Sequence, residues 1–529
     1  MEKNSISYSS SRWIAAAGSI WIQALIGGTY IFSTYSPILK SSQSYDQSTL
    51  DTVAVFKDIG SNAGVLSSLL YTFGPHHRYG VPWVVHLVGA TEGFLGYFFM
   101  WLAVVGLIPR PPVPLMCVFM FFAAHSQTFF NTWNVVTSVQ NFPHCSGTVV
   151  GLMKGFLGLS GAILIQVYKA FFKGDPSTYI LMLALLPSIV SLSLMSLVRL
   201  CPDKTAVDDK KHLNVMSLIS LLLAAYLMII LMLQDIFVFP QWARLFSFLV
   251  LLLLLSLPLR IATETAKKER SHPLLLKTEP LLYDPDSNEP EKKLVGVEND
   301  ELSVESMNLL EAMRSFNFWL LFLAILCGMG SGLATINNMS QLGQSLGYDT
   351  TNINTLVSLW SIWNFFGRFG AGYISDILLR QRGWARPLVM AIALAAMSVG
   401  HVIIGSGFIG NLYIGTILVG ICYGAQWSLM PTITSEIFGV LHMGTIYNAI
   451  AIANPLGTYV LSVWVIGHIY DKEAGEQNSC YGVRCFMVSF FILAFVSFFG
   501  CLVALILFFR TRVFYRSVVL RRIQSSIRS

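Results

Sequence analysis

Long apolar runs alternate with short polar segments along most of this 529-residue chain. A helix needs about 20 apolar residues to cross a bilayer, and each run is near that length. The pattern therefore predicts an all-α polytopic membrane protein with fourteen candidate helices. They lie near residues 13–39, 51–73, 81–107, 113–140, 146–172, 178–200, 213–235, 239–262, 316–342, 352–378, 385–406, 410–437, 444–469 and 484–510.

The spacing of these runs divides the chain into two sets of six helices with two helices between them. The count is twelve if residues 213–262 do not cross the membrane twice. We expect an N-terminal half over 1–200, two extra helices over 201–262 and a C-terminal half over 316–512.

Two segments differ in composition from the apolar runs. Residues 263–315 are charged, contain prolines and lack a long apolar run, which predicts a mostly disordered cytoplasmic linker. The sequence Pro-Leu-Leu occurs twice in the linker, at 273–275 and 280–282. The repeat could be a sorting signal, and the alternative is a short contact of the linker with the protein body. Residues 513–529 predict a basic cytoplasmic tail.

The composition supports the membrane assignment. The chain is 54% hydrophobic and 12% charged, with a mean hydropathy of +0.62, whereas soluble domains carry about 25% charged residues. The net charge of +6 comes from lysines and arginines in the loops. Such loop charges are orientation signals, so they do not indicate nucleic-acid binding.

The loop charges also predict the topology. Arg12, Lys210, the arginines of 380–386 and the basic tail fall on one side, while the loops near 340–352 and 406–411 carry no lysine or arginine. Basic loops face the cytoplasm, so both termini are expected there. Four basic residues fall on the other side, so the distribution of charges is a bias and not a strict rule. They are Lys40, Arg110, Lys169 and Lys173. The host membrane, plasma membrane or vacuole, stays open.

One loop carries a more specific pattern, within the sequence NFFGRFGAGYISDILLRQRGWARP at 364–387. An apolar helix with closely spaced glycines ends in Asp376 and a group of arginines. Asp376 could pair with an arginine or lie at the start of a neighbouring helix, whose dipole favours an anion. The alternative is an ordinary basic loop. The pattern resembles the loop signature of the major facilitator superfamily at Gly372, Asp376, Arg380, Arg382, Gly383 and Arg386.

Several further segments resemble the plant nodulin-like facilitators, the group that includes the nuclear-fusion-defective type. The resemblance implies a transporter built from two six-helix halves, with a substrate site between them near the bilayer midplane. The sequence departs from the family at Asn337 and Asn338, where the first position is often an aspartate, so a cation role is not implied there. The similar segments are 57–64, 141–143, 151–163, 340–348, 435–439 and 480–486.

Lys154 is the best candidate for binding a substrate. It lies inside an apolar helix among Gly151, Gly155 and Gly158, where a charge costs about 2.5–3.5 kcal/mol and by default indicates function. A cavity-facing lysine would attract an anionic group; the alternative is a structural partner. The resemblance further implies that the first and fourth helices of each half line the cavity. The candidates there are Gln127, Asn131, Asn134, Asn337, Asn338, Gln341, Gln426 and Trp427.

Other charged residues in the apolar runs suggest coupling and gating. Glu92 near the middle of the third helix could carry a proton. Asp58, beside Lys57, is a second coupling candidate, or an ordinary helix-start aspartate. Cys480 and Cys485 share a loop on the predicted non-cytoplasmic side, where a disulfide is permitted. We expect the gate between the halves to be formed by Arg368, Asp376, Arg380, Arg382 and Glu436.

These features predict a secondary transporter of a small solute. The lysines suggest that the solute is an organic anion, and proton coupling is left open. The sequence has no phosphate-binding glycine-lysine loop, and we expect no enzyme activity, cofactor or metal. We expect a monomer in the lipid bilayer. The alternative function is a transporter-like sensor or scaffold that signals through residues 263–315.

Overall fold

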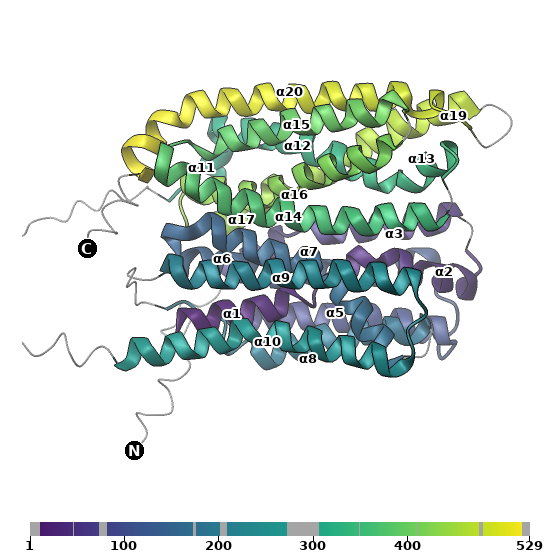
Figure 1. Cartoon of the computed structure of the whole chain (residues 1–529), viewed down its shortest axis with the longest axis horizontal. Coiled ribbons are helices and arrows are strands. Elements are labelled where there is room, and N and C mark those ends of the chain that lie inside the picture. Colours follow the sequence, from purple (N-terminus) through teal and green to yellow (C-terminus); the bar gives the residue numbers. More distant parts are fainter. Residues whose placement is uncertain are drawn as a thin grey trace, which may run out of the picture.

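The chain folds, in a computed structural model, into a bundle of long helices running side by side (Figure 1). The start of α1 and the end of α20 lie at the same end of the bundle, which we call the terminus side. The structure describes residues 11–45, 47–73, 82–172, 176–201, 209–271, 306–348, 350–408, 410–474 and 480–520, and no strand occurs among them. The all-α prediction is confirmed.

The first half and the two extra helices follow the apolar runs. They are α1 (Arg12–Gln23), η2 (Gly28–Ile31), α2 (Phe32–Gln43), α3 (Gln47–Asn62), α4 (Val65–Phe73), α5 (Pro82–Val105), α6 (Val113–Asn141), η3 (Pro143–Cys145), α7 (Ser146–Phe171), α8 (Pro176–Leu194), α9 (Asp209–Ile236) and α10 (Gln241–Ser271).

The second half begins with a short helix whose first turn is stabilised by a capping box. In it, the side chains of Asn308 and Glu311 each accept a hydrogen bond from the other residue's backbone nitrogen. Its elements are α11 (Leu309–Arg314), α12 (Phe316–Asn337), α13 (Met339–Ser345), α14 (Thr350–Arg382), α15 (Arg386–Ser406), α16 (Asn411–Phe438), α17 (Met443–Ala451), α18 (Ala453–Thr458), the π-helix η4 (Tyr459–Gly467), α19 (His468–Ala474), α20 (Arg484–Phe514) and the π-helix η6 (Tyr515–Val519).

Among the described residues, 12 helical segments are long and apolar enough to cross a membrane. Two further rods, α3–α4 and α14, lie in the same bundle (Figure 1). The sequence of α14 is less apolar because it contains Arg368, Asp376, Arg380 and Arg382. With these two rods, the described part of the chain contains the fourteen helices expected from the apolar runs.

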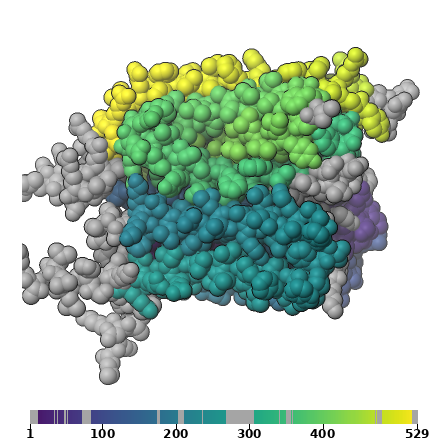
Figure 2. Space-filling model, viewed as in Figure 1, coloured from purple at the N-terminus to yellow at the C-terminus, as the bar shows by residue number. Residues whose placement is uncertain are grey.

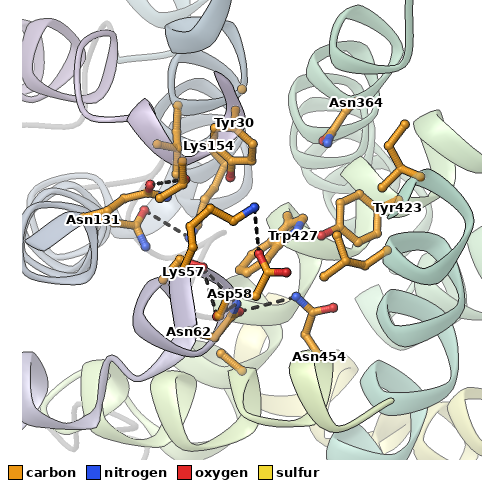
Figure 3. Close-up of a pocket in the computed structure, with 18 of the residues that line it drawn as sticks. Tyr30, Lys57, Asp58, Asn62, Asn131, Lys154, Asn364, Tyr423, Trp427 and Asn454 are labelled. Carbon is orange, nitrogen blue, oxygen red and sulfur yellow. Dashed lines mark hydrogen bonds and ion pairs between the residues drawn. The ribbon is translucent and has the colours of Figure 1, made fainter. Parts of the chain in front are cut away.

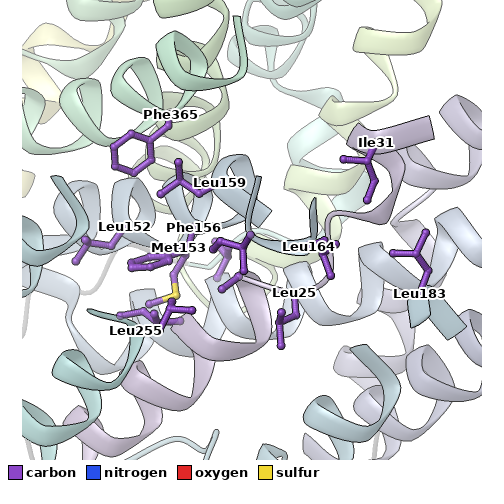
Figure 4. Packing of buried hydrophobic residues seen from close by; sticks show 14 of the residues in the cluster. Leu25, Ile31, Leu152, Met153, Phe156, Leu159, Leu164, Leu183, Leu255 and Phe365 are labelled. Carbon is purple, nitrogen blue, oxygen red and sulfur yellow. The ribbon is translucent and has the colours of Figure 1, made fainter. Parts of the chain in front are cut away.

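Each half has its own hydrophobic core, and the halves stack on each other (Figure 2). The N-terminal core includes α7 and extends into the other half, because Phe365 and Phe369 of α14 pack into it (Figure 4). The extra helices α9 and α10 belong to this core through residues such as Leu223 and Leu255. Large apolar side chains remain exposed on the outer helices, as at Leu249, which is typical of a surface that faces lipid.

The two halves approach most closely where small residues meet on α7 and α14. A Cβ atom added at Gly372 would lie 2.2 Å from the Gly147 carbonyl oxygen and 3.0 Å from the Gly151 Cα atom. Glycine at these positions lets the two backbones touch. This contact holds α7 of one half against α14 of the other.

Two segment boundaries differ from the sequence prediction. The predicted disordered linker begins and ends in helix, since α10 continues to Ser271 and α11 spans Leu309–Arg314. Residues 272–305, with the Pro-Leu-Leu repeat, lie outside the described residues. The predicted tail also begins in helix, because η6 continues α20 to Val519 and buries Tyr515.

Candidate functional site

A cavity of about 180 Å³ lies between the two halves (Figure 3). Both halves contribute polar and aromatic side chains to its wall, and few aliphatic ones. Such a lining suits a ligand with charged or hydrogen-bonding groups. The wall includes Tyr30, Lys57, Asp58, Asn62, Gln127, Asn131, Lys154, Asn337, Asn364, Tyr423, Trp427, Tyr447, Asn448 and Asn454.

Four of the rods around the cavity are interrupted. The breaks lie between α1 and η2, α3 and α4, α12 and α13, and α17 and α18. Residues beside each break line the cavity: Thr29, Asn62, Asn337 and Asn454. Interrupted membrane helices are tolerated where they line a cavity, and in transporters such breaks commonly accompany binding sites.

Lys154 reaches this cavity from the middle of α7, as its position in the apolar run predicts. Its side chain is completely buried, and its ammonium group donates hydrogen bonds to Asn131 Oδ1 at 3.1 Å and to the Tyr447 hydroxyl. The ammonium nitrogen lies 5.0 Å from the ring centroid of Trp427 and 4.8 Å from that of Tyr447. A cation at these distances is stabilised by the aromatic faces.

Arg368 lies directly behind the cavity wall and connects the two halves. Its guanidinium donates to Asn364 on its own helix at 2.7 Å, to the Lys154 carbonyl at 3.2 Å and to the Tyr30 hydroxyl at 3.3 Å. It also lies 5.5 Å from the ring centroid of Trp427. Arg368 was predicted to act in the gate beside Asp376, but the structure places it at the level of Lys154, two helical turns away.

The charges around the cavity do not balance. Lys57 and Asp58 pair with each other at 3.1 Å. Among the described residues, no carboxylate lies within ion-pair distance of Lys154 or Arg368. A buried charge is costly unless it is paired. The cavity region therefore contains two buried basic side chains without a carboxylate partner among the described residues.

The other predicted cavity residues divide into two groups. Gln127, Asn131, Asn337 and Trp427 line the cavity, and Gln127 accepts a 2.7 Å hydrogen bond from Thr29. The remaining four do not line it. Asn134 is buried without a hydrogen-bond partner in the described part of the chain, Asn338 donates to Ser462, Gln426 donates to the Met397 sulfur, and Gln341 is exposed on α13.

A second polar network lies on the terminus side, where α7 begins and α14 ends. Asp376 accepts hydrogen bonds from the backbone nitrogens of Gly147 and Thr148 at 3.2 and 2.7 Å, and from the Thr148 hydroxyl at 2.6 Å. It also pairs with Arg386 at 2.6 Å. Both predicted partners of Asp376, an arginine and a helix N-terminus, are therefore present in the structure.

This network extends to two more of the predicted gate residues. Glu436 pairs with Arg386 at 2.8 Å, and Arg380 donates to the His144 carbonyl just before α7. The structure does not bring Arg382 into the network, because its guanidinium lies over the ring of Trp384 instead.

Glu92 has a partner that sequence reasoning missed. Its carboxylate lies 2.8 Å from His125 Nδ1, across the interface of α5 and α6. The other ring nitrogen of His125 lies 3.0 Å from the Ala63 carbonyl oxygen, at the break between α3 and α4. A single histidine in an apolar run gives little sequence signal, because its partner is set by helix packing.

Other missed residues lie on α17 and α18. Tyr447, Asn448 and Asn454 line the cavity but belong to the fifth helix of the second half, which we had not assigned to the cavity. The sequence signal that could have identified them is the pair of asparagines, Asn448 and Asn454, six residues apart in an apolar run. The loop disulfide is formed as expected, between Cys480 and Cys485.

Comparisons with known proteins agree with this architecture. The sequence model of the family described as Nodulin-like matches residues 12–263, and that of the NFD4 C-terminal domain matches residues 301–517. The chain is 26% identical to Protein NUCLEAR FUSION DEFECTIVE 4 of Arabidopsis thaliana, over 95% of this chain and 89% of that protein. A Probable transporter MCH1 of Candida glabrata is 21% identical over 41% of this chain and 48% of that protein.

A solved structure has the same fold. The proton:xylose symporter XylE of the major facilitator superfamily superposes with a TM-score of 0.55 over 94% of this chain and 95% of that one, at 13% identity. Together, the two family models match most of the chain, the Candida glabrata relative is named a probable transporter, and the fold is that of the symporter XylE. The chain belongs to the nodulin-like, NFD4-type proteins of the major facilitator superfamily.

Proposed function

We propose that this membrane transporter moves a small organic anion by alternating access. The observation that carries the proposal is the pair of buried cations at the cavity, Lys154 and Arg368, which have no carboxylate partner among the described residues. An anion bound in the cavity beside them would supply the missing charge. Lys154 belongs to one half and Arg368 to the other, so the charge of the same anion would act on both moving bodies.

The rest of the wall favours an organic anion over a bare inorganic ion. Trp427 and Tyr447 present apolar ring faces, and Asn131, Asn364 and Asn454 present amides that hydrogen-bond hydroxyl or carbonyl groups. A carboxylate with a short carbon skeleton would use both kinds of surface.

The terminus-side network supports the alternating-access part of the proposal. Asp376 of α14 bonds to the start of α7, and Arg380 bonds to His144 two residues before it, so these bonds join the two halves at one end of the cavity. Rocking the halves to open that end would break them. We propose that Asp376, Arg380, Arg386 and Glu436 stabilise the state in which the terminus side is closed.

The test is solute uptake by purified protein in proteoliposomes, with a panel of small carboxylates, amino acids and inorganic ions. Replacing Lys154 by Ala removes a charged hydrogen-bond donor, so we expect uptake of a carboxylate to fall by roughly 10- to 100-fold. Lys169→Ala is the matched control, because Lys169 lies on the same helix but bonds to Gln234 outside the cavity. Wild-type uptake by Lys154→Ala would contradict the proposed role of this lysine.

A further inference from the structure

Glu92, His125 and the Ala63 carbonyl form a chain of hydrogen bonds across three rods of the N-terminal half. His125 Nδ1 lies 2.8 Å from Glu92 Oε2, and His125 Nε2 lies 3.0 Å from the Ala63 oxygen. The imidazole is 2% exposed and lies between the rings of Phe121 and Phe129, each with its centroid 5.2 Å away. The ring is therefore held in a fixed orientation.

Hydrogen-bonding rules limit which proton arrangements of the pair fit these two contacts. A carbonyl oxygen only accepts hydrogen bonds, so His125 Nε2 must carry a hydrogen to bond Ala63. The 2.8 Å contact between His125 Nδ1 and Glu92 then requires a second proton, either on the imidazole or on the carboxyl group. Without it, a nitrogen lone pair would face a carboxylate oxygen, and the contact would be repulsive. The two contacts are therefore compatible with a pair that holds this second proton.

Loss of the proton has one direct consequence for the backbone. A neutral imidazole has a single N–H, which can serve Glu92 or Ala63 but not both. Because the carboxylate is the stronger acceptor, the hydrogen moves to Nδ1, and the bond to the Ala63 carbonyl is lost. The proton state of the pair thus decides whether the break between α3 and α4 is held by His125.

The break touches both the cavity and the other half. The last turn of α3 before it brings Asp58 and Asn62 to the cavity wall. Within it, Gly64 packs against Asn448 of α17, where an added Cβ would lie 2.2 Å from the amide oxygen. The amide of Asn448 donates to Ser68 on α4 and Thr132 on α6. A change at Ala63 therefore reaches the substrate wall and an interface between the halves.

We propose that Glu92 and His125 form the proton-binding site of this transporter and couple one proton to rearrangement of the α3–α4 break. The inference rests on the proposed function, because coupling requires a transported solute. It extends the sequence-based suggestion for Glu92 by assigning His125 as its proton partner and Ala63 as the point of transmission.

Other titratable groups on the surrounding helices do not contact the pair. In the described part of the chain, its polar contacts are those between Glu92, His125 and the Ala63 carbonyl. Lys57 and Asp58 on α3 pair with each other, and His86 on α5 contacts Ser191. The remaining titratable side chains described on the helices packed against α5 and α6 are Arg12, Tyr35, Lys40, Tyr97, Cys117, His144, Cys145, Lys154, Tyr168, Lys169, Tyr179 and Tyr447.

The test compares two kinds of transport in proteoliposomes, with acetate, lactate, succinate and benzoate as probes. Counterflow exchanges solute without a proton gradient, whereas accumulation driven by a pH gradient requires coupled protons. Glu92→Gln keeps a hydrogen bond to His125 without a titrating proton. We expect this variant and His125→Gln to lose accumulation and to retain counterflow. His86→Gln is the matched control, a buried histidine on the same helix as Glu92 without a carboxylate partner in the described residues, and should retain both.

Accumulation that persists in both pair variants, or counterflow that is lost together with it, would overturn the proposal. A second measurement needs no solute. Infrared difference spectra of the purified protein after a pH step should contain a carboxyl signal that is missing from Glu92→Gln. Spectra that are identical in wild type and Glu92→Gln over the full pH range would also overturn the proposal. Absence of counterflow in the wild type with every probe would instead count against the proposed function, and the infrared result would still decide the proton site.

Discussion

Asp376 near the end of α14 accepts three hydrogen bonds from the first turn of α7, two of them from Thr148. The carboxylate thus occupies the positive end of the α7 dipole, where an anion is favoured. Because α7 and α14 belong to different halves, this single side chain ties the halves together on the terminus side. Arg386, which also pairs with Glu436, holds the carboxylate in place from the C-terminal half.

Replacing Asp376 by Asn should weaken the contact between α14 and α7 while a side chain of similar size still fills the position. The amide retains one acceptor oxygen but loses the charge that strengthens its bonds to the helix N-terminus and to Arg386. With a loss of about 1–3 kcal/mol, hydrogen–deuterium exchange at the Gly147 and Thr148 amides should accelerate by roughly tenfold or more. Mass spectrometry of the peptide covering residues 144–150 measures this rate. The control is Arg382→Gln, whose side chain lies over Trp384 outside the network. Equal exchange in the two variants would contradict the gate.

Two glycines on α14 provide a matched pair for the contact between the halves. A Cβ at Gly372 would lie 2.2 Å from a backbone oxygen of α7, whereas a Cβ at Gly370 meets nothing within 4 Å. Gly372→Ala should therefore force the helices apart at a cost of about 1–3 kcal/mol. Gly370→Ala should be neutral or stabilise by up to about 1 kcal/mol, because alanine is the better helix former. Intrinsic-fluorescence melting in detergent should rank Gly372→Ala lowest, and indistinguishable melting curves would refute this account.

The fold and part of the site could be predicted because they depend on local sequence. Apolar length determines which segments become membrane helices. Lys154 could be found because a charged side chain inside a membrane helix is costly and therefore usually has a function. Asp376 could be found because the glycine-to-aspartate spacing and its arginines lie within one segment.

The remaining site residues depend on how helices rotate and where they break, which a single sequence encodes weakly. Asn131 and Asn134 are only three residues apart, yet one lines the cavity and the other does not. The break at Ala63 determines what His125 can bond. The sequence Gly-Ser-Asn-Ala-Gly at 60–64 is typical of such a break, but it does not indicate that His125 is the partner. Arg368 and Asp376 share a helix but contact different partners at different depths, which their common face does not reveal.

Trp427 lies beneath both buried cations, with its ring centroid 5.0 Å from the Lys154 ammonium and 5.5 Å from the Arg368 guanidinium carbon. If its face stabilises the cations that receive the anion, Trp427→Phe should retain most of the solute affinity because it retains an aromatic face. Trp427→Leu should weaken it by about tenfold, in line with a cation–π contribution of about 1–2 kcal/mol. The affinity is measured as the half-saturation concentration for carboxylate counterflow. Trp363→Leu controls for loss of a tryptophan, since this side chain packs against Phe366 outside the cavity wall. Equal losses in Trp427→Phe and Trp427→Leu would show that ring size rather than the aromatic face matters at this position.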